Sequence, residues 1–118
     1  MTASKLEAKF LFLWRCLDGP KLEIEYRFHP KRKWRADFVH LPSKTLIEIE
    51  GGAWVGGRHN RGGGFVKDAE KYLEATLAGW CVVRLTEKQV EVEWIDRLIA
   101  FLSTLPAVKP SSHSDPTR

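Results

Sequence analysis

Three carboxylates in the middle of the chain have the residue types and the spacing of a cation site. Asp37 lies in one segment of alternating polarity, and Glu48 and Glu50 lie in the next, beyond a short turn at residues 40–43. Residues i and i+2 of a strand share a face, so the two glutamates would lie with Leu46, and strand pairing through the turn would bring Asp37 beside Glu48. Acids clustered on an apolar sheet are costly unless a cation neutralises them. Their hard oxygen atoms suit Mg²⁺ or Mn²⁺, which also bind phosphate oxygens.

A second interpretation of these acids needs no metal. Arg35 or Lys44 would pair with them at a solvated strand edge, as charged side chains on protein surfaces often do. Position along the chain alone leaves the two interpretations open.

Hydrophobic periodicity predicts seven elements that would position the acids. We expect helices over residues 4–17, 65–78 and 87–105, and strands over residues 22–28, 34–40, 45–50 and 80–85. The order α-β-β-β-α-β-α predicts an α/β fold, with a mixed sheet flanked by helices and an antiparallel meander formed by the first three strands. Alternation places Trp34, Ala36 and Phe38 on one face of the second strand.

Apolar spacing also predicts which side chains are inside. For the second helix the expected inner face comprises Phe65, Ala69, Tyr72, Leu73 and Thr76. The large aromatic residues expected in the core are Phe10, Trp14, Trp80, Trp94 and Phe101.

Length and composition exclude several classes of protein. The chain has 118 residues, which suits one domain over residues 1–105, followed by a tail at 106–118 that we expect to be disordered. The longest strongly apolar run, Phe10 to Trp14, falls far short of the roughly 20 residues that span a bilayer. Two cysteines without metal-ligand spacing, and no apolar leader, predict a reduced cytoplasmic protein with no membrane partner.

Basic residues gather in two acid-free stretches, although the net charge is only +4. At the predicted hairpin tip we expect phosphate-backbone contacts from Lys31, Arg32, Lys33 and Arg35, or otherwise a solvated turn. The stretch 51–64 holds seven of the nine glycines. There Arg58, His59 and Arg61 would contact nucleic acid if the stretch is a binding arm rather than a surface loop.

Five blocks in order resemble the PD-(D/E)XK nuclease superfamily, and more narrowly the small phage and bacterial endonuclease domains related to the very-short-patch repair endonuclease. The blocks are RKWRADF (32–38), IEIEGG (47–52), GRH (57–59), DAEK (68–71) and GWCVVR (79–84). The resemblance covers about residues 4 to 90 and implies a restriction-endonuclease-like fold.

The resemblance also implies roles for individual residues. Asp37 and Glu48 would be metal-binding carboxylates, and the backbone carbonyl of Ile49 a further ligand. The third motif position departs from the family, because Glu50 replaces the usual lysine; Glu50 would hold a second metal or orient the attacking water.

Two more residues are nominated by the resemblance. Lys71 on the following helix would replace the missing lysine, although the expected inner face points it away from the core, where it would pair with Asp68. Glu7 on the first helix would join the metal site, or else form a capping box with Ser4.

The function implied by the resemblance is that of a Mg²⁺-dependent (or Mn²⁺-dependent) DNA endonuclease that hydrolyses phosphodiester bonds. A non-catalytic nucleic-acid-binding module of the same fold and a nuclease specific for RNA or branched DNA remain as alternatives. Because so small a chain covers little DNA, we expect a homodimer or a larger phage or host assembly.

Overall fold

The computed structural model describes residues 4–50 and 63–107, and it has the predicted α/β arrangement. A four-stranded mixed sheet and three helices follow one another as α-β-β-β-α-β-α. The elements are α1 (Lys5–Cys16), β1 (Glu23–Arg27), β2 (Arg35–His40), β3 (Thr45–Ile49), α2 (Gly63–Leu77), β4 (Cys81–Leu85) and α3 (Val92–Thr104). From residue 108 onward, the expected tail lies outside the described residues.

The sheet has the strand order β1-β2-β3-β4, and its first three strands form the predicted antiparallel meander. A tight turn joins β2 to β3, in which the N–H of Lys44 donates to the carbonyl of Leu41 at 2.9 Å. β4 then joins β3 in parallel, with Glu48 opposite Arg84. Parallel pairing requires a crossover connection, and α2 lies within that connection.

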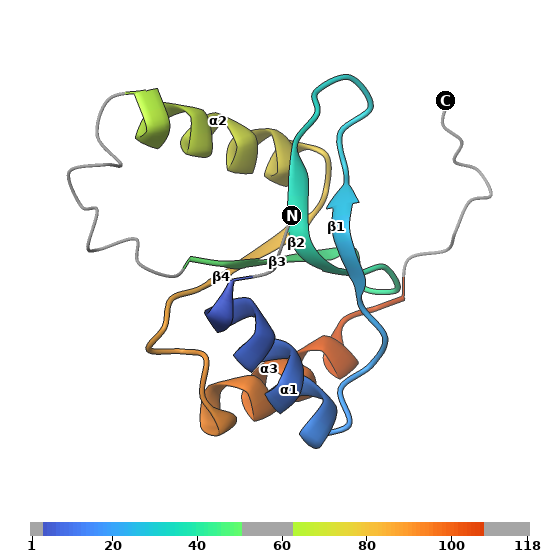
Figure 1. Ribbon diagram of the computed structural model, residues 1–118. Helices are drawn as coiled ribbons and strands as arrows, with labels where there is room; N and C mark the ends of the chain where they lie inside the picture. The colour runs from blue at the N-terminus through green and yellow to red at the C-terminus, as the bar shows by residue number, and fades with distance from the viewer. Residues whose placement is uncertain (1–3, 51–62, 108–118) are drawn as a thin grey trace.

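Helices cover both faces of the sheet (Figure 1). α1 and α3 cover one face, where Phe10 and Trp14 of α1 and Leu98 of α3 pack with Phe38 and Ile47 of the sheet. α2 lies against the other face (Figure 1), over a smaller cluster that contains Ala36, Val39, Leu46 and Ala75. The apolar faces of β3 therefore agree with the alternation predicted from the sequence.

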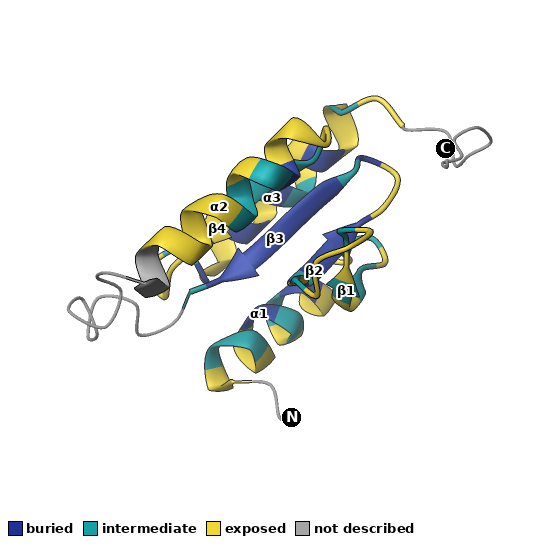
Figure 2. Cartoon of the chain, turned by 90° about the horizontal axis from the view of Figure 1, so that it is seen from above, coloured by how far each residue is buried: buried dark blue, intermediate teal, exposed yellow. Residues whose placement is uncertain are grey.

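β3 is the most enclosed strand of the sheet. All five of its residues are buried, whereas most of α2 is exposed (Figure 2). Because β3 runs between β2 and β4, an acid on this strand is held among neighbours from three elements. This placement fixes the surroundings of Glu48.

Three details differ from the expectations. α3 begins at Val92 rather than near residue 87, because residues 86–89 form a turn in which Thr86 donates its backbone N–H to the Gln89 side chain at 2.9 Å. Trp94 and Phe101 are 45% and 43% exposed, so the prediction that they belong to the core is wrong.

The third difference concerns β2. Ala36 packs with Val39 while Phe38 packs on the opposite face, so the expected face shared by Ala36 and Phe38 is interrupted at Asp37. Over the described ranges, no helix combines the length and the apolar character needed to cross a membrane.

Candidate metal and phosphodiester site

Asp37 and Glu48 lie side by side at the open end of the β2–β3 ladder, as the sequence predicts. The Asp37 N–H donates to Oε2 of Glu48 at 3.3 Å, and the Ile49 N–H donates to Oδ2 of Asp37 at 2.8 Å. Each carboxylate thus accepts a hydrogen bond from the backbone of the opposite strand. The two side chains are held in place by the sheet itself.

Burial makes this acidic pair costly to ionise. Glu48 is 6% exposed, and its pKa is raised to about 7: burial is the main cause, Lys71 opposes the rise, and Asp37 adds to it. Burial also raises the pKa of Asp37, against the lowering effects of the Ile49 N–H and of Lys71. In both cases desolvation outweighs the available positive charge. Binding of an additional cation would therefore stabilise the ionised form of both carboxylates.

Lys71 reaches this pair from α2, contrary to the orientation predicted from apolar spacing. Its Nζ lies 3.4 Å from Oε1 of Glu48, and its side chain is 15% exposed. Ala75, one turn further on, is fully buried, whereas Leu73 is 58% exposed. The expected inner face was therefore right for Tyr72 but wrong for Ala69, Leu73 and Thr76, which are exposed, while the side chain of Phe65 lies outside the described part of the chain. The small Ala75 permits close approach to the sheet, and the polar partner of Lys71 lies beneath the same face. No ion pair with Asp68 forms.

The sequence did not single out Tyr72 as a site residue. Its hydroxyl donates toward Oε1 of Glu48 at 3.3 Å and toward Oε2 of Glu50 at 3.4 Å. Burial, together with Glu48 and Glu50, raises the pKa of Tyr72, so the phenol keeps its proton. Two local signals could have identified it: its place on the expected inner face of the second helix and its position next to Lys71 in the chain.

Glu50 lies on the same side of the sheet as Glu48, as the i, i+2 spacing predicts. Its carboxylate, however, is bound by the guanidinium of Arg84 from β4. The Arg84 Nε and Nη2 atoms donate to the two Glu50 oxygens at 2.5 and 3.0 Å. The expected alternative partners are wrong: Arg35 pairs with Glu25 at 3.8 Å, and Lys44 donates to the carbonyl of Ala78 at 2.7 Å.

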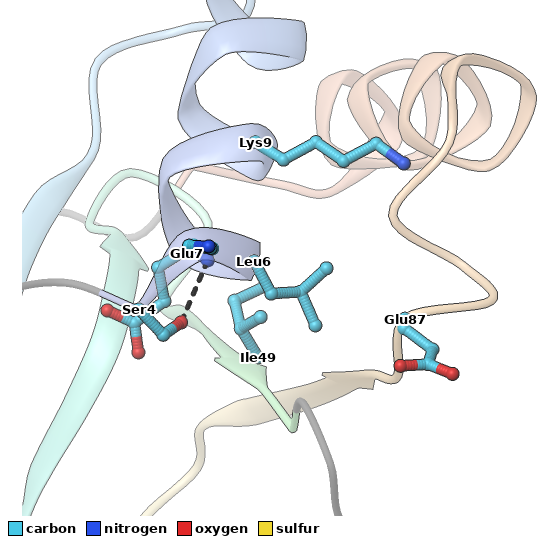
Figure 3. A pocket seen from close by; sticks show the side chains of 7 residues that line it. Ser4, Leu6, Glu7, Lys9, Ile49 and Glu87 are labelled. Atoms are coloured by element: carbon cyan, nitrogen blue, oxygen red, sulfur yellow. Dashed lines mark hydrogen bonds between the residues drawn. The ribbon is translucent and has the colours of Figure 1, made fainter.

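Glu7 lies in the first turn of α1, next to Ser4, the partner expected for a capping box. The Ser4 hydroxyl caps α1 by accepting the Glu7 N–H at 3.0 Å (Figure 3), as a capping motif requires. Burial and, to a smaller extent, Asp37 raise the pKa of Glu7, so its carboxyl group lies within the field of Asp37. It also lines a cavity of about 560 Å³ that Ile49 borders from β3 (Figure 3).

The donor set fits a hard divalent cation. Among residues 4–50 and 63–107, no group of three or more His, Cys, Asp or Glu side chains is arranged as a metal site. Mg²⁺, however, is commonly held by one or two carboxylates and completes its shell with water and phosphate oxygens. Asp37 and Glu48 supply the two carboxylates, and the Ile49 carbonyl belongs to the same strand end.

The basic hairpin between β1 and β2 is attached to α2. Arg32 places its Nη1 3.0 Å from Oε2 of Glu70, and its guanidinium lies 3.9 Å from the centre of the Trp34 ring. His29 Nδ1 accepts the N–H groups of Lys31 and Arg32 at 3.0 and 2.8 Å, which closes the turn.

The residues that the sequence predicts to bind nucleic acid differ in their surroundings. Arg32 and Arg35 have partners within the protein, whereas Lys31 and Lys33 are exposed at the tip. Arg58, His59 and Arg61 lie outside the described residues.

Comparisons of the chain with family models, with curated proteins and with solved structures found no match.

Proposed function

We propose that the protein is a metal-dependent DNA endonuclease whose site is formed by Asp37, Glu48 and Lys71. The observation that carries the proposal is the convergence of these three side chains from β2, β3 and α2. Two adjacent carboxylates and one amino group, in a partly dehydrated setting, suit metal-dependent hydrolysis of a phosphodiester. The order of the three residues in the chain is also that implied by the PD-(D/E)XK resemblance, with the lysine moved to α2.

Each residue then has a distinct task. Asp37 and Glu48, with the Ile49 carbonyl, would hold the cation, and Mg²⁺ or Mn²⁺ bound there would supply acidification of water and neutralisation of phosphate charge. Lys71 places positive charge beside Glu48, where it stabilises the anionic phosphate in the transition state. Water adds to phosphorus, the bond to one ester oxygen breaks, and that oxygen leaves with a proton as an alcohol.

The DNA backbone would be held by the exposed lysines of the hairpin tip. Lys31 and Lys33 project from a turn that is attached to the helix carrying Lys71, through Arg32 and Glu70. A phosphate bound at the tip therefore has a fixed relation to the site. Such contacts position the substrate without reading its sequence.

The experiment is cleavage of supercoiled plasmid with Mg²⁺ or Mn²⁺, comparing the wild type with Asp37→Ala and Glu48→Ala and including an EDTA control. Nicking or linearisation should require the metal and disappear in both variants. Glu93→Ala, which removes an exposed acid from the first turn of α3, is the matched control and should cut normally. Metal-independent cleavage, or equal cleavage by Asp37→Ala, would contradict the proposal.

One observation favours a second candidate, a nucleic-acid-binding module without catalysis. The Lys71–Glu48 ion pair partly neutralises the buried acid by itself, as a substitute for a metal would. This candidate predicts DNA binding without cleavage of duplex, single-stranded, mismatched or branched DNA, or of RNA, under either metal.

A further inference from the structure

The proposed site leaves three charged or polar residues beside it without a role: Glu50, Tyr72 and Arg84. Both carboxylate oxygens of Glu50 have partners within the protein, because Arg84 binds both of them and the Tyr72 hydroxyl approaches Oε2. A two-pronged guanidinium contact of this kind is among the more specific charge pairs in proteins. A carboxylate so engaged is poorly placed to act as a ligand for a second metal.

Tyr72 connects this pair to the metal-site acid. Its single hydroxyl lies between Oε2 of Glu50 and Oε1 of Glu48, and the Arg84 guanidinium lies 4.5 Å from the centre of its ring. Oε1 of Glu48 also accepts a hydrogen bond from the Nζ of Lys71. Two consecutive residues of α2 therefore converge on one oxygen of β3.

Apolar packing defines the rotation of α2 about its axis only weakly. Ala75 is its only fully buried side chain among residues 66–77, while the larger Val66, Leu73 and Leu77 are exposed. Burial of one methyl group stabilises an orientation only slightly. The polar contacts made by Lys71 and Tyr72 must therefore contribute much of the preference for the observed face.

We propose that Glu50, Tyr72 and Arg84 form a positioning unit, rather than part of a second metal site, and that this unit holds α2 so that Lys71 lies at Glu48. The inference rests on the proposed function for its catalytic meaning. Its structural content is independent of that function: Glu50 is not a metal ligand, and Tyr72 determines where the Lys71 amino group lies.

Metal binding without nucleic acid tests the first statement. Mn²⁺ affinity is measured by the loss of the free Mn²⁺ electron-spin signal for the wild type, Asp37→Asn and Glu50→Gln, with Glu93→Gln as the charge-matched control. Asp37→Asn should raise Kd at least about tenfold, because it removes a proposed ligand. Glu50→Gln should change Kd less than about twofold, because Arg84 binds both Glu50 oxygens in the metal-free protein. A tenfold weakening in Glu50→Gln would overturn the inference.

Lysine side-chain NMR tests the second statement whether or not the protein cleaves DNA. The Lys71 ammonium resonance, assigned by its loss in Lys71→Arg, should move toward those of exposed lysines in Tyr72→Phe and in Glu50→Gln. An unchanged resonance in both variants would overturn the positioning role. Tyr72→Phe keeps the ring and should fold; Arg84→Lys, which keeps the charge but not the two-pronged contact, provides a second variant with the same expectation.

Kinetics separate this inference from the proposed function. If the wild type cleaves DNA, Tyr72→Phe should lower kcat about tenfold with KM unchanged, because Lys71 contributes to the transition state rather than to substrate binding. A change confined to KM would contradict positioning. If the wild type neither cleaves nor binds Mn²⁺, the proposed function fails, while the lysine resonances still decide the role of Tyr72.

Discussion

The Nζ of Lys71 lies 3.4 Å from Oε1 of Glu48, which sets a flexible cation from a largely exposed helix against a carboxylate buried in the central part of the sheet. Asp37 contacts the same glutamate from the other side, through its backbone N–H. Glu48 is thus the residue at which β2, β3 and α2 meet.

Replacing Lys71 by Met should lower the cleavage rate about 100-fold, the usual scale for loss of one group that stabilises transition-state charge. DNA affinity should stay within about threefold, because the exposed basic residues of the hairpin tip remain. Plasmid cleavage and fluorescence anisotropy measure the two quantities. Lys67→Met removes an exposed lysine from the same helix and should retain cleavage. Equal losses of cleavage rate in the two variants would mean that Lys71 contributes only to the overall positive charge of the protein and not to the site.

The stability of the metal-free protein should fall as the pH rises from about 4.5 to about 7. The pKa of Glu48 is raised from 4.5 to about 7 in the fold, so the folded chain binds more protons than the unfolded chain across this window. The loss amounts to about 3 kcal/mol at most. Urea unfolding at a series of pH values measures it.

Two controls accompany that titration. Glu48→Gln cannot ionise and should show a much flatter curve, whereas Glu93→Gln should keep the slope of the wild type. Mg²⁺ should stabilise the wild type more above the pKa of Glu48 than below it, since protons and cations compete for the same oxygens. Parallel curves for the wild type and Glu48→Gln would refute the assignment of the slope to Glu48.

Removing both Lys31 and Lys33 by substitution with Ala should weaken DNA binding without destabilising the fold, because both side chains are exposed. If each lysine contacts one phosphate, the slope of log K against log salt should decrease in magnitude by about two. Arg32→Ala should differ, because Arg32 joins the hairpin to Glu70 and Trp34. It should lower thermal stability as well as affinity. If the lysine and arginine variants changed thermal stability equally, Arg32 would have no structural role distinct from that of Lys31 and Lys33.

Gly19→Ala should destabilise the protein by about 2 kcal/mol, within the range expected for overpacking. A Cβ at residue 19 would collide with the ring of Trp14, which is buried and donates its Nε1–H to the carbonyl of Pro20 at 2.7 Å. Thermal unfolding measures the effect. Combined with Trp14→Phe, which frees space, the same substitution should cost much less; strict additivity would rule out the collision as the cause.

The sequence predicted those parts of the fold and the site that depend on local spacing. Alternation across a short turn was enough to place Asp37 beside Glu48, since a tight turn leaves little freedom in strand register. The end of α2 was predicted equally well from Gly79, which adopts a φ of 92° that favours glycine.

The rotation of α2 and the partner of Glu50 could not be predicted in this way. Apolar spacing assigned both Tyr72 and Leu73 to the interior, but Leu73 is exposed, and the face that packs carries Ala75 and the polar side chains of Lys71 and Tyr72. Their partners lie on β3, more than 20 positions away in the chain. Arg84 meets Glu50 only because β4 pairs in parallel with β3, a register that a crossover, and not a turn, determines.

The chain connectivity of the site has a consequence for folding kinetics. Asp37 and the Ile49 N–H are 12 positions apart in a hairpin, whereas Glu48 and Lys71 are separated by 23 positions and Glu50 and Arg84 by 34. Closing longer loops costs more entropy and slows the formation of the contacts that they bring together. The acidic half of the site should therefore assemble early, and the basic half should be added in the slower step in which β4 docks beside β3.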